Sequence, residues 1–262
     1  DLPAARGLKS RLARGETVYG VWITLESPSL TEIAARLGFD WVVIDAEHGH
    51  LDLKNVMEHV RVANLTGLAC LVRVSDIQMG LIKRVMDIGA DGILVPQVRR
   101  PEEVRQAVQY AKYPPLGVRG IGAERSTRWA KGIEVCVPKA NEHTVVIPLL
   151  ETADAVAALD EILAVEGVDA FYFGPHDFAA TSGRPGAWDE PEITRKLMAA
   201  QRRVREAGKP CGIMAFAKDD IERRQREGFS MIGFGMDTGL FIQSAVEALR
   251  SVGREVPPQA WG

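Results

Sequence analysis

Eight short apolar segments alternate with helical patterns along the whole chain, and this alternation restricts the fold more than any other feature. The segments are nearly continuous apolar runs, which is typical of parallel strands buried on both faces. Several of the helical stretches between them end at a glycine, as helix C-termini commonly do. The predicted strands lie at 19–24, 41–46, 69–75, 92–97, 145–151, 170–175, 210–216 and 231–237.

Eight strand–helix units predict an α/β protein with a (β/α)8 TIM barrel formed by residues 1–262 as a single domain. A short helix should precede the first strand, and a further helix should follow the last. A doubly wound open sheet is the alternative, but the GxGxxG turn usual after its first strand is missing.

Composition excludes several classes of protein. The net charge is −3 and the pI is about 6.0, so no basic surface is expected to attract nucleic acid. The longest apolar runs are far shorter than the roughly 20 residues that span a membrane, and no signal-peptide core is evident. Three widely spaced cysteines form no metal-binding pattern, which indicates a reducing, cytoplasmic location. We expect all three to be small core residues: Cys70, Cys136 and Cys211.

One connection is much longer than the few residues usual between a helix and a strand. Residues 113–144 are rich in Pro and Gly at their start and should contain a short helix near Trp129 to Val135. We expect this segment to be an ordered excursion that either covers the functional site or lies at a subunit interface.

Ionisable residues follow five of the predicted strands. In a (β/α)8 barrel the carboxyl ends of the strands meet on one rim, where the chemistry takes place. A single charged strand end means little, whereas the convergence of several on one rim predicts a catalytic site. The rim residues are Asp45, Glu47, His48, Arg73, Gln97, Glu151, Gly174, His176, Asp177 and Asp237.

Two of these carboxylates, Glu151 and Asp177, follow adjacent strands about 4.8 Å apart. Carboxylates this close either share a proton or hold a cation. With two protein ligands, a hard divalent ion such as Mg²⁺ keeps positions for water and substrate. The alternative is that both residues only start polar loops or cap helices.

Arg73 and His48 complete the predicted chemistry. The charge of a buried arginine must be met, either by an anionic substrate or by a structural Arg–Asp pair. A histidine such as His48 can gain and lose a proton near neutral pH; the alternative is that it is a packed loop residue. A Schiff-base mechanism needs a lysine at the rim. Among the lysines only Lys218 is predicted near the rim, and it is expected to begin a helix, so Schiff-base chemistry is disfavoured. The glycine-rich turn at 233–239 is of a kind that often binds phosphate in barrels, but the negative charge of Asp237 disfavours phosphate binding here.

Several motifs in the same order resemble the HpcH/HpaI-type class II pyruvate aldolases. The resemblance extends over about residues 16–245 and implies a (β/α)8 barrel that uses Mg²⁺, Mn²⁺ or Co²⁺. It implies cleavage or formation of 4-hydroxy-2-oxo acids, with pyruvate and an aldehyde as the other partners. It also implies a hexamer, a trimer of dimers that exchange the last helix. The motifs are DAEHGHLD, LVRV, MDIGADGILVP, YPPLGVRGIGA, LLETADAV, GPHD and GFGMDT.

The resemblance assigns roles to individual residues. It makes Glu151 and Asp177 the metal ligands, His48 the proton relay beside Asp45, and Arg73 the group that stabilises the transition state. It also makes Asp87 the residue that raises the basicity of the histidine. Asp87 precedes the fourth strand, however, so it should lie at the bottom of its own barrel. It reaches a catalytic histidine only if the strand boundary lies elsewhere or a neighbouring subunit supplies it.

The sequence departs from the family at two positions that should flank the substrate. Leu149 stands where a Gln is frequent, and His176 stands where a small residue or Asn is frequent. We expect His176 to hydrogen-bond a hydroxyl on the oxo acid, which would favour hydroxypyruvate over pyruvate. Leu149 favours the alternative of a CoA-thioester lyase like the citrate lyase β-chains. A citrate-synthase-like condensing enzyme and a non-catalytic binding barrel also remain open, and oxaloacetate decarboxylation is expected of the aldolase.

Overall fold

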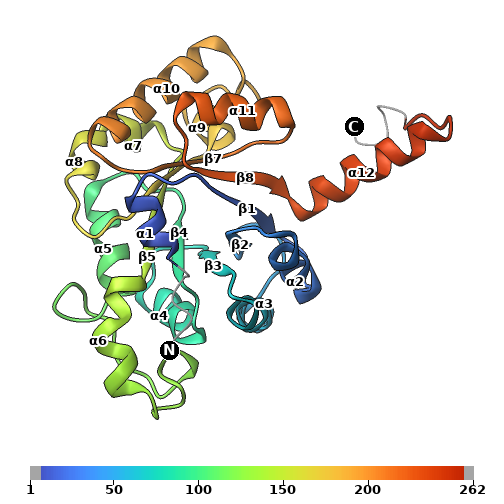
Figure 1. Ribbon diagram of the computed structural model, residues 1–262. Coiled ribbons are helices and arrows are strands. Elements are labelled where there is room, and N and C mark those ends of the chain that lie inside the picture. Colours follow the sequence, from blue (N-terminus) through green and yellow to red (C-terminus); the bar gives the residue numbers. More distant parts are fainter. Residues whose placement is uncertain (1–6, 257–262) are drawn as a thin grey trace.

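The protein, seen in a computed structural model that describes residues 7–256, is a closed barrel of eight parallel strands surrounded by helices (Figure 1). The strands follow one another around the barrel in chain order, and the last pairs with the first. The predicted (β/α)8 fold is therefore confirmed. The strands are β1 (Val18–Ile23), β2 (Trp41–Asp45), β3 (Ala69–Arg73), β4 (Gly92–Val95), β5 (Val145–Leu150), β6 (Phe171–Phe173), β7 (Cys211–Met214) and β8 (Met231–Met236).

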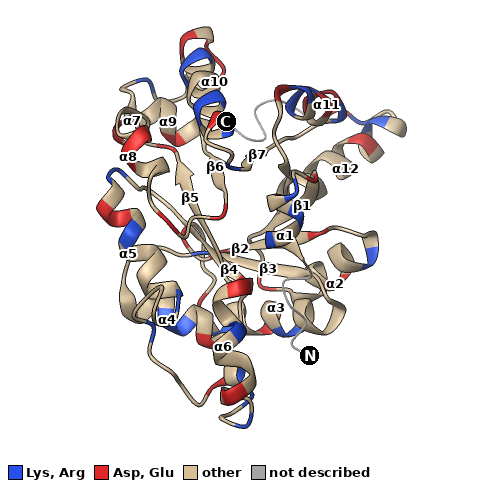
Figure 2. Cartoon of the chain, turned by 60° about the vertical axis from the view of Figure 1, so that its left-hand side comes forward, with Lys and Arg blue, Asp and Glu red and all other residues tan. Residues whose placement is uncertain are grey.

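The helices form the outer layer. Figure 2 shows acidic and basic residues mixed over these helices, for example on α10 and α11. The short N-terminal helix is present as α1. The helices are α1 (Leu8–Ala13), α2 (Pro28–Leu37), α3 (Leu53–Thr66), α4 (Met79–Ile88), α5 (Pro101–Ala111), η1 (Arg125–Thr127), α6 (Ile133–His143), α7 (Ala153–Ala157), α8 (Leu159–Leu163), α9 (Pro175–Thr181), α10 (Pro191–Glu206), α11 (Lys218–Glu227) and α12 (Asp237–Ser251).

A repeated signal sets the start of three even-numbered strands. A glycine with positive φ ends the preceding turn, and an aspartate follows two residues later, as in Gly38 and Asp40. Each aspartate accepts a hydrogen bond from a backbone N–H of the neighbouring strand. The donors are Tyr19, Cys70 and Val146, at 2.7–2.9 Å. This repeated bond fixes the register of each strand pair. The three aspartates are Asp40, Asp91 and Asp169.

The core has two layers. One lies between the strands and the helices, and the other fills the barrel interior with Trp22, Trp41 and Tyr172 among its members. Gly20 makes room for this interior layer, because a Cβ there would lie 2.1 Å from the Trp41 indole. The barrel is therefore packed with side chains, and only its rim is open for chemistry. All three cysteines are free and buried, as predicted.

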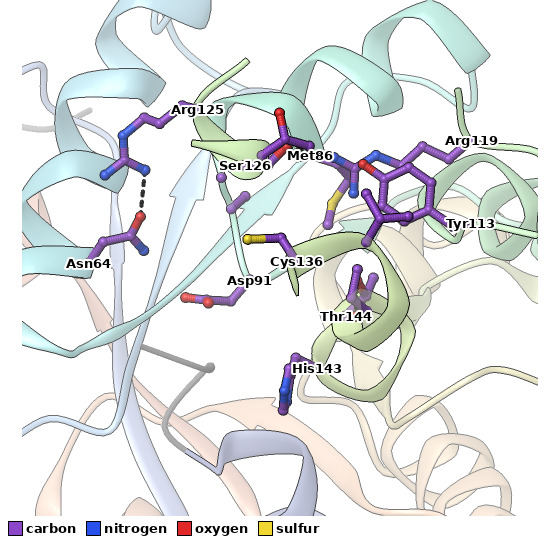
Figure 3. A pocket seen from close by; sticks show the side chains of 15 residues that line it. Asn64, Met86, Asp91, Tyr113, Arg119, Arg125, Ser126, Cys136, His143 and Thr144 are labelled. Atoms are coloured by element: carbon purple, nitrogen blue, oxygen red, sulfur yellow. Dashed lines mark hydrogen bonds between the residues drawn. The ribbon is translucent and has the colours of Figure 1, made fainter. Parts of the chain in front are cut away.

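The excursion at 113–144 differs from its prediction in two ways. Its helix is α6, which begins at Ile133, because Arg128, Trp129 and Ala130 have left-handed φ values of 52–68° that no α-helix accommodates. It also packs at the amino ends of the strands, where it lines a cavity with Asp91 (Figure 3). The excursion therefore does not cover the rim of its own barrel.

The cavity shown in Figure 3 lies at the end of the barrel opposite the predicted chemistry. Asp91 lines this cavity. Burial raises the pKa of the Asp91 carboxyl group to about 7, and the side chain accepts the backbone N–H of Cys70. Arg125 is held away from it by hydrogen bonds to Asn64 and to the carbonyl of Ile88. These contacts tie the excursion to the barrel, and we assign the chemistry to the other end because the strands direct the charged groups there.

The last helix, α12, projects away from the barrel (Figure 1). Only its first residue, Asp237, is buried, whereas Phe241 is 74% exposed. No helix within residues 7–256 combines the length and the apolar character needed to cross a membrane. The apolar side chains of α12 are therefore left without cover by the part of the chain that the structure describes.

Asp237 joins the two strands that close the barrel, and we expect its loss to destabilise the protein. Its carboxylate accepts the backbone N–H groups of Thr24 and Leu25 at 2.9 and 3.0 Å and the Thr24 hydroxyl at 2.7 Å. Replacing Asp237 by Ala leaves these part-buried donors without their acceptor, so the free energy of unfolding should fall by about 1–3 kcal/mol. Urea unfolding measures this change. Asp160→Ala, at a side chain that is 83% exposed, is the control and should have a much smaller effect. Equal midpoints for Asp237→Ala and the parent would contradict this role.

Candidate active site

The neighbouring strands β2 and β3 end in an arginine–aspartate pair. Asp45 and Arg73 are register partners, and both are buried. The Arg73 Nε and Nη2 atoms donate to the two Asp45 oxygens at 2.9 and 2.5 Å. The carboxylate also accepts the backbone N–H groups of Glu47 and His48 at 3.1 and 3.2 Å. Asp45 thus fixes both the guanidinium and the start of the following loop.

Two further contacts hold the guanidinium. Its Cζ lies 4.7 Å from the centre of the Trp22 ring, and the Trp22 indole donates to the Tyr172 hydroxyl at 3.2 Å. Glu47 Oε2 lies 2.8 Å from Arg73 Nη1, yet it is buried without a hydrogen bond of good geometry. Burial raises the pKa of Glu47, and the nearby arginine opposes this rise. Arg73 is therefore fixed on three sides.

Glu151 directly follows β5 and is 1% exposed. One of its oxygens accepts the backbone N–H of Gln97 at 2.7 Å, and Gln97 takes up a left-handed φ of 52° at the end of β4. Burial, together with the charges of Asp177 and Glu47, raises the pKa of Glu151 to about 7. A nearby cation would offset this cost, since it favours the charged carboxylate.

The next strand brings Asp177 beside this carboxylate, in the first turn of α9. Gly174 at the end of β6 permits the approach, because a Cβ there would lie 2.8 Å from Glu151 Oε2. His176 precedes Asp177, and its ring lies 4.8 Å from that of Trp188. Glu151 and Asp177 thus follow adjacent strands and border one cavity.

A cavity of about 390 Å³, open to solvent, is lined by several of these groups. It brings together Arg73, Leu149, Glu151, Gly174, His176 and Asp177 out of the predicted site residues. Within residues 7–256 no three His, Cys, Asp or Glu side chains converge closely enough to hold a metal alone. The fit is thus that of an ion held by Glu151 and Asp177, with the other positions left for water and substrate. Oxygen ligands suit Mg²⁺ and Mn²⁺.

Three predicted catalytic residues are not among those that line this cavity. Asp45 is buried and paired with Arg73. The side chain of His48 is 65% exposed, and its Nε2 lies 3.8 Å from Glu47 Oε2. Asp87 is on the last turn of α4, where it pairs with Arg119 at 2.7 Å. As expected from the topology, it lies at the amino ends of the strands, so its catalytic role remains a prediction that needs a second subunit.

Sequence analysis did not identify Trp22, Tyr172 or Trp188 as site residues. The first two lie inside apolar strands, where they resemble ordinary core residues. Trp188 lies in the otherwise polar stretch GRPGAWDEPE, and a lone Trp in such a loop was the available signal. The sequence presents a structural Arg–Asp pair and substrate binding as alternatives for Arg73. In the structure Arg73 pairs with Asp45 and also borders the cavity.

A parallel barrel with a buried arginine and two carboxylates at its rim has the arrangement of a (β/α)8-barrel enzyme. The comparisons with known proteins agree with this class. Residues 18–244 match the HpcH/HpaI aldolase/citrate lyase family, and the chain belongs to it. The resemblance found in the motifs is thereby confirmed.

Individual relatives cover nearly the full chain. A 2-keto-3-deoxy-L-rhamnonate aldolase of Escherichia coli is 35% identical over 243 residues, which is 92% of this chain and 91% of the relative. An HpcH/HpaI aldolase/citrate lyase family protein of Burkholderia cenocepacia has a TM-score of 0.88 at 30% identity, covering 95% of this chain and 99% of the other. The citrate synthase SbnG has a TM-score of 0.84 at 29% identity, covering 94% and 96%.

Proposed function

We propose that this protein is a metal-dependent aldolase that forms or cleaves 4-hydroxy-2-oxo acids through the enolate of pyruvate or hydroxypyruvate. The observation that carries the proposal is the pairing of Glu151 and Asp177 in one cavity with Arg73. The similarity to a 2-keto-3-deoxy-L-rhamnonate aldolase supports the same reaction class. A divalent ion held by Glu151 and Asp177 would supply positive charge that acidifies the hydrogen at C3 of the oxo acid.

Arg73 stabilises the negative charge that develops on the substrate. A guanidinium carries five N–H donors, of which one on each nitrogen faces Asp45 or Glu47. Two donors remain, on the side of the cavity. Because they are already fixed by the pair with Asp45, they need no rearrangement as the enolate forms.

We assign the proton transfer to His48, because an imidazole can act as a general acid or a general base. Asp45 supports it by accepting the backbone N–H of His48 at 3.2 Å, which fixes the loop that carries the side chain. Leu149 and Gly174 border the oxo acid. His176 hydrogen-bonds the hydroxyl group of hydroxypyruvate and so selects it over pyruvate.

We also propose that the chain works as a homo-oligomer, a hexamer of helix-exchanging dimers. Two features support this assembly. The exposed apolar residues of α12, including Phe241, need a partner surface. Asp87 lies too far along its own barrel for its predicted role, so that role requires a neighbouring subunit.

Decarboxylation of oxaloacetate tests the enolate half-reaction without a choice of aldehyde. Protein stripped of metal should release no pyruvate, and addition of Mn²⁺, Mg²⁺ or Co²⁺ should restore release. Coupled detection of pyruvate measures the rate. If none of the three ions restores release, the enolate proposal is wrong. The same protein would then be assayed for a CoA-thioester lyase and for a citrate-synthase-like condensation.

A further inference from the structure

The outer wall of the candidate active site is aromatic. His176, on α9, stacks on Trp188 with ring centres 4.8 Å apart and planes inclined by 40°. Trp188 comes from the loop between α9 and α10, and both rings border the cavity that contains Glu151 and Asp177. The stack therefore stands beside the place where a partner of the bound oxo acid must sit.

The charged side chains on this side of the cavity are already paired with one another. On α11, Asp220 lies 2.6 Å from Arg223 Nη2 and 3.2 Å from Arg224 Nε. Arg224 also pairs with Glu227 at 3.1 Å. These ion pairs offset one another, so the outer wall presents little free charge to a ligand.

Apolar side chains fill the rest of this wall. Phe216, after β7, is 53% exposed and Trp188 is 39% exposed, although both border the cavity. Met214 and Met236 lie deeper, at the ends of β7 and β8. Exposed aromatic side chains at a cavity mouth contribute most to the free energy of binding when a flat apolar ligand covers them. A chain of hydroxyl groups would instead lose hydrogen bonds to water there.

We propose that the wall formed by Trp188 and His176 binds the body of the acceptor aldehyde and selects planar apolar aldehydes over polyhydroxylated ones. This inference rests on the proposed function, because the aldehyde must meet the enolate beside Glu151 and Asp177. In the addition, C3 of the enolate forms a bond to the aldehyde carbon. The π bond of the aldehyde carbonyl opens, and its oxygen takes up a proton. This proton balances the one removed from C3, so no oxidant or reductant is needed.

The test compares addition of pyruvate to benzaldehyde with addition to glyceraldehyde. The parent protein should have a kcat/KM for benzaldehyde at least about 10-fold higher, equivalent to about 1.4 kcal/mol. Trp188→Ala should lower that preference about 10-fold, mainly through the KM for benzaldehyde, and Trp188→Phe should restore most of it. Leu37→Ala, which shortens a side chain that is 73% exposed on α2, is the matched control and should keep the preference.

Each rate is divided by the rate of oxaloacetate decarboxylation by the same variant, so that general damage to the site cancels. A parent protein that prefers glyceraldehyde, or a preference unchanged in Trp188→Ala, overturns the aromatic wall while metal-dependent decarboxylation still supports the proposed function. Absence of decarboxylation in the parent overturns both.

Discussion

Exchange of Glu151 for Gln should reduce metal-dependent pyruvate release from oxaloacetate by about 10³-fold or more. The amide has the same shape as the carboxylate, and its oxygen can still accept the Gln97 N–H that now lies 2.7 Å away. The fold should therefore be kept. What the change removes is the negative charge, and with it one of the two groups that would hold the divalent ion.

Direct measurement of Mn²⁺ binding by calorimetry, alongside the decarboxylation rate, separates the loss of metal from a loss of fold. Glu166→Gln is the matched control, because Glu166 is exposed and lies on the loop before β6. It should bind Mn²⁺ and release pyruvate as the parent does. If Glu151→Gln binds Mn²⁺ as tightly as the parent, Glu151 is not a metal ligand and the assignment is wrong.

The part of the site that depends on strand order could be predicted from the sequence. Arg73, Glu151 and Asp177 all follow buried strands, and a closed barrel of parallel strands brings such positions to one rim. The eight apolar runs therefore determined both the fold and the convergence of these residues. The same reasoning placed Asp87 at the opposite end, where the structure has it.

What could not be predicted depends on loops and on contacts distant in sequence. Asp237 is a rim carboxylate in the sequence, but its hydrogen bonds to Thr24 and Leu25 give it a structural role. Trp188 follows no strand and no helical period, so only the fold brings it to His176. The left-handed φ values of Arg128, Trp129 and Ala130 before α6 could not be predicted either, because residues other than glycine rarely adopt them.

Arg73→Lys should lower the kcat for pyruvate release by about 10²–10³-fold, the usual cost of losing one preorganised donor to a developing oxyanion. Lysine keeps the positive charge that buried Asp45 requires, but it lacks the planar fork that reaches Asp45 and the cavity together. The loss should therefore appear in kcat more than in the affinity for Mn²⁺. Arg36→Lys, at a side chain that is 76% exposed on α2, is the control and should change neither quantity.

This variant also decides between the two roles considered for Arg73. If the arginine serves only to neutralise Asp45, Arg73→Lys should lower the melting temperature while the folded enzyme retains most of its activity. If Arg73 also stabilises the enolate, activity should fall far more than the small loss of stability explains. The second outcome is favoured because Arg73 borders the same cavity as Glu151 and has more N–H donors than Asp45 and Glu47 engage. A Lys variant with near-parental kcat would limit Arg73 to the structural role.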